Sequence, residues 1–128
     1  MARKPSTTLT EAELRLMTVL WERGPSTVAE ITAALPAPPI AYNSVLTTMR
    51  ILDQKGYVAH EEQGRAFVYR TLVERDDAAK SAVGHVLSRF FDNSASSLAL
   101  RLIEDERPSS EELRRLRALI DQYEGDAR

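Results

Sequence analysis

The feature that most constrains the fold is a change in the period of the hydrophobic pattern near residue 56. Before it, apolar residues recur every three or four positions in three short stretches, as they do in amphipathic helices. After it, two short runs (57–62 and 66–71) resemble strands, and residues 63–65 between them are typical of a hairpin turn. Three short helices followed by a β-hairpin predict a winged helix-turn-helix. The expected fold class is therefore mainly α, of α+β type.

Cap signals mark the ends of the predicted helices. Thr10 with Glu13, and Thr27 with Glu30, have the T-x-x-E spacing of a capping box, which satisfies free N–H groups at a helix start. A third helix is expected over residues 41–55, followed by a closing glycine. In the first helix Leu16, Val19 and Leu20 widen the apolar stripe of Leu14, Met17 and Trp21. In the next two helices the residues expected to face the core are Val28, Ile31, Leu35, Val45, Met49 and Leu52.

Residues 73–128 return to helical spacing and form the second predicted domain, after a winged helix over residues 1–72. Apolar stripes predict helices over 79–90 and 95–104, and the capping box of Ser109 with Glu112 starts another. Short helices with so much apolar surface and no sheet to cover it favour a C2 homodimer. The alternative is that they fold back onto their own N-terminal domain. The residues expected at the dimer contact are Val83, Leu87, Phe90, Leu98, Leu102, Leu113, Leu116, Ile120 and Tyr123.

The charge is unevenly distributed along the chain. The formal net charge is −2, with +1 in residues 1–72 and −3 in residues 73–128. A charge of +1 is modest for a DNA-binding domain, so DNA binding has to rest on pattern and on a few well-placed cations. The N-terminus lacks the apolar run of a signal peptide, and no apolar run reaches membrane length. We therefore expect a cytoplasmic protein with no direct membrane binding.

Nothing in the sequence favours an enzyme. The chain has no cysteine, and His60 and His85 are isolated, without metal-ligand spacing. The five glycines are scattered and form no phosphate-binding loop. We expect no catalytic residue, no metal and no cofactor.

The third predicted helix has the features of a recognition helix. In a helix-turn-helix, the N-terminal residues of this helix meet base edges in the major groove. Arg65 in the hairpin turn is expected to contact a flanking phosphate or the minor groove, and Arg3, Lys4 and Lys55 are further candidates for phosphate contacts. The residues expected to bind DNA are Tyr42, Asn43, Ser44, Leu46, Thr47, Arg50 and Arg65.

Two other classes of function stay open at this point. One is a winged helix that binds another protein, which the low positive charge and the apolar seam near the C-terminus favour. The other is a regulator that binds a small molecule between its domains, for which the chain is short.

Several motifs in order give the chain a family resemblance. They are L-T-E-A-E-L-x-x-M-x-x-L-W (9–21), T-V-A-E-I (27–31), A-Y-N-S-V-L-T-T-M-R (41–50), K-G-Y-V (55–58) and G-R-A-F-V-Y (64–69). Together they resemble the penicillinase repressor family of BlaI/MecI/CopY type, over about residues 8–123. The resemblance implies a homodimeric winged-helix repressor on a two-fold operator that controls a resistance or stress-response gene and its own gene.

The resemblance leaves the mode of induction open. Members that respond to β-lactams are released through a membrane sensor-protease system, with cleavage between an asparagine and a phenylalanine in the dimerisation half. The matching position here is Arg101-Leu102, which departs from that pattern. Copper-responsive members use C-terminal cysteines, which this chain lacks, so copper sensing of that kind is excluded.

Overall fold

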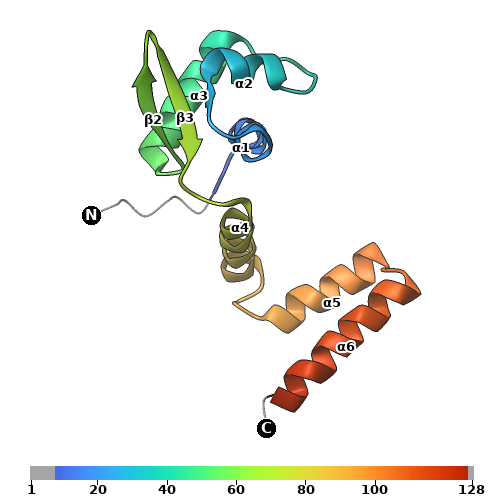
Figure 1. The fold of residues 1–128 in the computed structure, drawn as a ribbon. Coiled ribbons are helices and arrows are strands. Elements are labelled where there is room, and N and C mark those ends of the chain that lie inside the picture. The colour runs from blue at the N-terminus through green and yellow to red at the C-terminus, as the bar shows by residue number, and fades with distance from the viewer. Residues whose placement is uncertain (1–7, 127–128) are drawn as a thin grey trace. The chain divides into compact units, whose positions relative to one another are not determined.

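The computed structural model describes residues 8–126 (Figure 1). Its elements are α1 (Glu11–Arg23), β1 (Ser26–Thr27), α2 (Val28–Ala34), α3 (Tyr42–Lys55), β2 (Val58–Gln63), β3 (Ala66–Thr71), α4 (Arg75–Phe90), α5 (Ala95–Glu106) and α6 (Ser110–Asp126). The chain divides into two compact units, the first ending at His85 and the second starting at Val86. The domain boundary expected after residue 72 stays a prediction.

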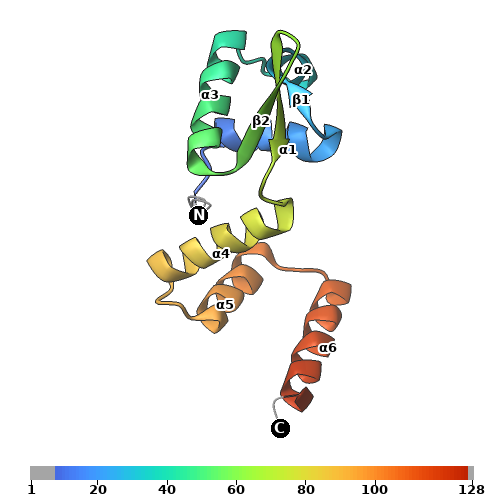
Figure 2. The same cartoon turned by 60° about the vertical axis from the view of Figure 1, so that its left-hand side comes forward.

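The first unit is a winged helix, as predicted. Helices α1, α2 and α3 pack around one apolar core, and the β2–β3 hairpin lies alongside α3 (Figure 2). The sheet has the order β1-β3-β2, and both pairs are antiparallel. The two-residue strand β1 has no signal in the sequence, because so short a strand shows no alternation. The buried apolar residues are Leu16, Met17, Val19, Leu20, Val28, Ile31, Val45, Met49, Leu52, Tyr57, Val58 and Tyr69.

Two details of the predicted core are wrong. Leu14 is 46% exposed, because it lies on the outer side of α1 while Leu16, Met17 and Leu20 fill the core. The first strand of the hairpin, β2, begins at Val58 rather than at Tyr57. The side chain of Tyr57 is buried just before the strand. Trp21 is half-buried against the core, and its Nε1 donates a hydrogen bond to the carbonyl oxygen of Val73 at 2.9 Å.

All three predicted capping boxes are confirmed. In α1 the Glu13 backbone N–H donates to Thr10 Oγ1 at 3.2 Å, and the Thr10 N–H donates to Glu13 Oε1 at 2.7 Å. The same reciprocal bonds join Thr27 with Glu30. They also join Ser109 with Glu112 at the start of α6. These boxes explain why the helices begin where the sequence pattern places them.

Glu13 also joins the first helix to the third. Its side chain is buried, and Lys55 Nζ at the end of α3 donates to Glu13 Oε1 at 2.8 Å. Burial by itself raises the pKa of Glu13, but the hydrogen bonds from Lys55 and from the Thr10 backbone outweigh burial and leave the pKa below its ordinary value. The ionised carboxylate therefore stabilises the fold.

Glu13→Gln is expected to lower the free energy of unfolding at neutral pH by about 2 kcal/mol, since it weakens charge-assisted hydrogen bonds to a buried group. The contribution of Glu13 is full above the pKa of an unfolded glutamate, about 4.3. It is lost as the pH falls through the lower pKa of the folded state. Urea unfolding from pH 7 to pH 3 should therefore show a smaller loss of stability with acid in the variant than in the wild type. Parallel curves would contradict this assignment.

The helices after the winged helix form no buried core of their own, although α4 begins in the first unit and only its end lies in the second. Within the described residues, no side chain of α4, α5 or α6 is buried, although all three helices have apolar stripes. Phe90 is 73% exposed and Tyr123 is 65% exposed, and Leu87 and Leu98 are half-buried. The other large apolar residues exposed on these helices are Val83, Val86, Leu100, Leu102, Ile103, Leu113, Leu116, Leu119 and Ile120. Among residues 8–126, no helix is long and apolar enough to cross a membrane.

Candidate nucleic-acid interface

The outer face of α3 carries polar side chains. Val45, Met49 and Leu52 point into the core, so residues half a turn away from them face outward. Asn43 and Thr47, which are four residues apart, are exposed on that outward face. The Thr47 hydroxyl donates to the Asn43 carbonyl oxygen at 3.0 Å, which leaves the lone pairs of its oxygen as acceptors. The face therefore offers an amide that both donates and accepts, beside a hydroxyl acceptor.

The start of α3 differs from the starts of α1 and α2. Its N-cap residue is Ala41, and no side chain caps it. The loop that leads into it is held in place by Arg15, whose guanidinium donates to the carbonyl oxygens of Pro36 at 2.7 Å and Pro38 at 2.5 Å. First-turn N–H groups without a side-chain cap suit a phosphate oxygen.

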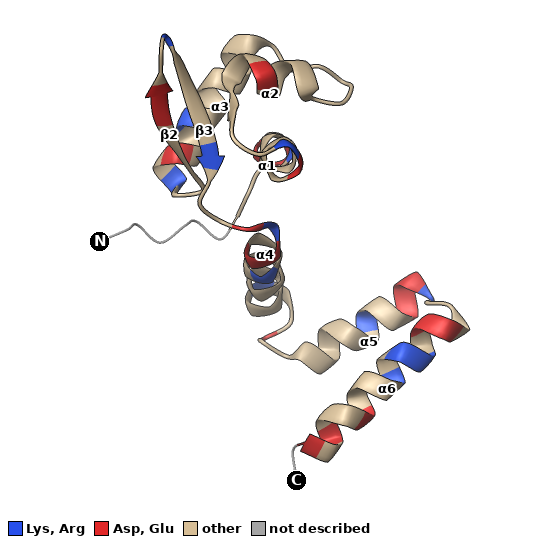
Figure 3. Cartoon of the chain, in the orientation of Figure 1, with Lys and Arg blue, Asp and Glu red and all other residues tan. Residues whose placement is uncertain are grey.

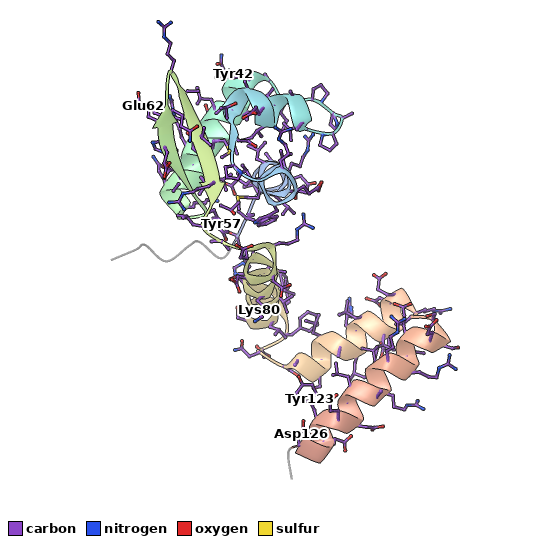
Figure 4. The ribbon with its side chains drawn as sticks, in the orientation of Figure 1. Tyr42, Tyr57, Glu62, Lys80, Tyr123 and Asp126 are labelled. Carbon is purple, nitrogen blue, oxygen red and sulfur yellow. The ribbon has the colours of Figure 1, made fainter. Side chains whose placement is uncertain are left out.

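The predicted DNA contacts of α3 do not all face the same way. Leu46 is half-buried and packs against the core, while Ser44 is exposed and its carbonyl oxygen accepts a hydrogen bond from Thr48. Tyr42 is half-exposed at the start of the helix (Figure 4). Arg50 is exposed.

Tyr69 on β3 is buried, and charged side chains of α3 act on its pKa. Its pKa is raised, first by burial and then by the negative charge of Asp53. Arg50 opposes this rise, and Tyr42 adds to it.

The β2–β3 hairpin forms the wing. It pairs in register from Val58 with Thr71 to Gln63 with Ala66, which leaves Gly64 and Arg65 as the loop. Gly64 has φ 62°, a left-handed conformation that favours glycine. Arg65 is exposed at the tip, and the wing tip and the start of α3 lie at the same end of the unit (Figures 2 and 4).

The wing also carries negative charge. Glu61 and Glu62 are exposed on β2, close to the basic tip (Figure 3). Carboxylates at this position disfavour the approach of a phosphate backbone, so near the tip of the wing Arg65 lies next to two anions, and the other arginine of the hairpin, Arg70, lies nearer its base.

Lys55 has a structural partner. Its ammonium group forms an ion pair with Glu13, as described above. This ion pair explains the lysine at position 55 without a contact to phosphate. Arg3 and Lys4, the other predicted basic contacts, lie outside the described residues.

The sequence interpretation missed one contact in this region. His60 is isolated in the sequence pattern, but in the structure its Nδ1 lies 2.5 Å from Asp53 Oδ2 on α3. The two residues belong to a helix and a strand, and no spacing rule connects them. Among the described residues, no group of three histidine or carboxylate side chains is arranged to hold a metal ion.

The peptide bond between Arg101 and Leu102 lies inside α5. The Arg101 Nε donates to Asp105 Oδ2 one turn further on, at 3.0 Å, and Leu102 is half-exposed. A protease that binds an extended backbone has to unwind this helix to reach the bond.

Comparisons with known proteins agree with this architecture. The family model described as "Penicillinase repressor" matches residues 9–122. The penicillinase repressor of Bacillus licheniformis is 26% identical over 116 residues, which cover 90% of this chain and 91% of the relative. The methicillin resistance regulatory protein MecI of Staphylococcus aureus (strain N315) is 22% identical, over 88% of this chain and 92% of that protein.

A solved structure matches more than half of the chain. The solution structure of the DNA-binding domain of the repressor BlaI is 26% identical, with a TM-score of 0.52, and it covers 59% of this chain and 93% of that domain. Since the family model spans nearly the whole chain, the protein belongs to the penicillinase repressor family.

Proposed function

We propose that this transcriptional repressor binds a two-fold symmetric operator as a homodimer, with one winged helix in each half-site. The observation that carries the proposal is the polar outer face of α3, on which Asn43 and Thr47 are exposed. The start of α3 lies at the same end of the unit as the tip of the wing (Figure 2). Asn43 has the chemistry to pair with an adenine edge, and Thr47 to accept a hydrogen bond from a base. Arg65 supplies a phosphate or minor-groove contact that positions the domain.

The helices α4, α5 and α6 support the homodimer. Three helices without a single buried side chain among their described residues do not form a stable domain alone. A second copy of the same surface covers such stripes symmetrically. The expected contacts are the nine apolar residues named from the sequence, from Val83 to Tyr123.

Dimerisation also links the second unit to induction in this proposal. Two weak half-sites joined in one dimer bind far more tightly than either half-site alone. Any event that opens α5 or α6 then releases the DNA, including cleavage at Arg101-Leu102 by a sensor-protease system. The regulated gene is expected to be a resistance or stress-response gene together with the repressor's own gene.

The first test is fluorescence anisotropy on the DNA upstream of the protein's own gene, at about physiological salt, against a scrambled duplex. We expect tight binding that resists competitor DNA, at two chains per inverted repeat and with a steep dependence on salt. Equal and weak binding to both duplexes would rule out autoregulation. Selection of binding sites from random DNA would then separate a distant operator from a winged helix that binds protein, because only a DNA-binding protein enriches a sequence.

At the uncapped start of α3, one substitution is expected to raise the free energy of unfolding and to lower the affinity for the operator. Ala41→Ser adds a side-chain cap, which should raise the free energy of unfolding by about 1 kcal/mol. The same hydroxyl occupies an N–H group that a phosphate would use, so operator affinity should fall about fivefold per half-site. Thermal unfolding and anisotropy measure the two effects. A more stable protein with unchanged affinity would show that no phosphate binds at this helix start.

A further inference from the structure

The wing has little support beyond its base. Along β2 only Val58 is buried and Ala59 is half-buried, while the four residues from His60 to Gln63 are exposed. On its other side β3 pairs with β1, but only at Tyr69 and Val68, so nearer the tip the sheet consists of the two hairpin strands alone. Two strands by themselves are marginally stable without packing against something else. The direction of the wing tip therefore depends on whatever contacts join the outer part of the hairpin to the rest of the unit.

His60 and Asp53 form such a contact. His60 Nδ1 lies 2.5 Å from Asp53 Oδ2, and because a carboxylate only accepts, Nδ1 carries the hydrogen. Asp53 lies in the last turn of α3, and His60 lies two residues beyond the buried base of β2. The bond thus connects the recognition helix directly to the exposed part of the wing.

The imidazole ring is held on the hairpin side as well. Its centroid lies 4.8 Å from that of Phe67 and 5.5 Å from that of Tyr69, both on β3. His60 is the cross-strand partner of Tyr69, and Glu62 is the partner of Phe67, so these side chains share one face of the hairpin. Tyr69 is buried and Phe67 is half-exposed, so the His60 ring contacts one aromatic ring in the core and one nearer the tip of the wing.

These contacts hold the hairpin at His60, and the rest of the wing extends beyond that point. From His60 the strand continues for three residues to Gln63, about 10 Å at the rise of a β-strand, and the tip with Arg65 follows. A small rotation of the hairpin about its base moves Arg65 by the largest amount, while Asn43 and Thr47 on α3 stay in place. The contact between His60 and Asp53 limits that rotation.

We propose that His60, held by Asp53, is a positioning residue that sets the wing so that Arg65 reaches the DNA backbone. The inference rests on the proposed function, since it assumes that the wing binds DNA. In this proposal His60 makes no contact with DNA. It affects binding only through the position of Arg65.

The test is a double-mutant cycle on the full-length protein, with an operator chosen by site selection. His60→Ala is expected to weaken binding about fivefold and to lower the salt slope of binding by about one for each half-site, as Arg65→Ala does. In the Arg65→Ala background, His60→Ala should have no further effect. Additive effects of the two substitutions would overturn the proposal, as would a His60→Ala variant that binds like the wild type.

Two further variants separate positioning from charge and from general loss of stability. His60→Asn keeps a donor near the position of Nδ1 without a titratable ring, so it should restore most of the affinity. Gln63→Ala lies on the same strand but on the opposite face of the hairpin and is uncharged, so it should bind like the wild type. Failure of His60→Asn to restore binding would assign the effect to the charge or the ring instead. Substitutions of Asp53 are avoided, because they also remove a negative charge near the DNA.

The outcomes distinguish this inference from the proposed function. If the wild type selects no sequence, the proposed function fails. If the wild type binds specifically and Arg65→Ala weakens binding, while His60→Ala adds its own independent loss, only the positioning role fails.

Discussion

Leu116→Asp is expected to lower operator affinity by about 10²- to 10⁴-fold while the winged helix remains folded. Leu116 lies on the exposed apolar stripe of α6 with Leu113, Ile120 and Tyr123, and a carboxylate there opposes burial against a second copy. Leu116 belongs to the second unit, whereas the residues of the proposed DNA surface belong to the first. The loss comes from separating two half-sites that otherwise bind as one. Analytical ultracentrifugation and anisotropy on the full operator measure the two linked changes.

Gln122→Asp is the matched control for this variant. It adds the same charge to the same helix, but on the side away from the apolar stripe, so the dimer and the affinity should be unchanged. Binding to a single half-site should be similar in wild type, control and Leu116→Asp. A Leu116→Asp protein that is monomeric but still binds the full operator with wild-type affinity would contradict the proposed mechanism.

The elements that could be predicted from sequence are those with local causes. Each capping box is a contact over three residues, so Thr10 with Glu13 and Thr27 with Glu30 specify their helix starts without help from the rest of the fold. The change from helical spacing to strand-like runs likewise located the wing. The central turns of α3 were predicted because Val45, Met49 and Leu52 repeat on one face, and all three are buried.

The contacts that escaped prediction join elements far apart in the chain. Lys55 was expected to be a candidate for phosphate contact, but it pairs with Glu13, which is 42 positions away. Leu46 was expected on the DNA side, yet it is half-buried and packs against the core. His60 and Asp53 meet only when the wing has folded against the helix. Pattern analysis of single segments contains no information about such pairs.

Asn43→Ala is expected to cost about 1–3 kcal/mol in each half-site, and therefore about 2–6 kcal/mol in the dimer, or roughly 30- to 10⁴-fold in affinity. Asn43 is the exposed amide on the outer face of α3, and its loss removes both a donor and an acceptor from a base edge. Because it bears no charge, the salt slope of the remaining binding should stay as in the wild type. The binding of a panel of operators, each with one base pair changed, measures the effect.

Arg65→Ala, measured on the same panel of operators, is the comparison for Asn43→Ala. A phosphate contact at the wing tip acts on every sequence alike, so its loss should weaken binding uniformly across the panel and reduce the salt slope. Asn43→Ala should instead remove discrimination at one symmetric pair of positions and leave the other positions unchanged, provided that its unfolding temperature matches the wild type. If Asn43→Ala weakened binding equally to all operators, α3 would be positioned on the backbone rather than in the major groove. Sequence would then have to be read by another part of the winged helix.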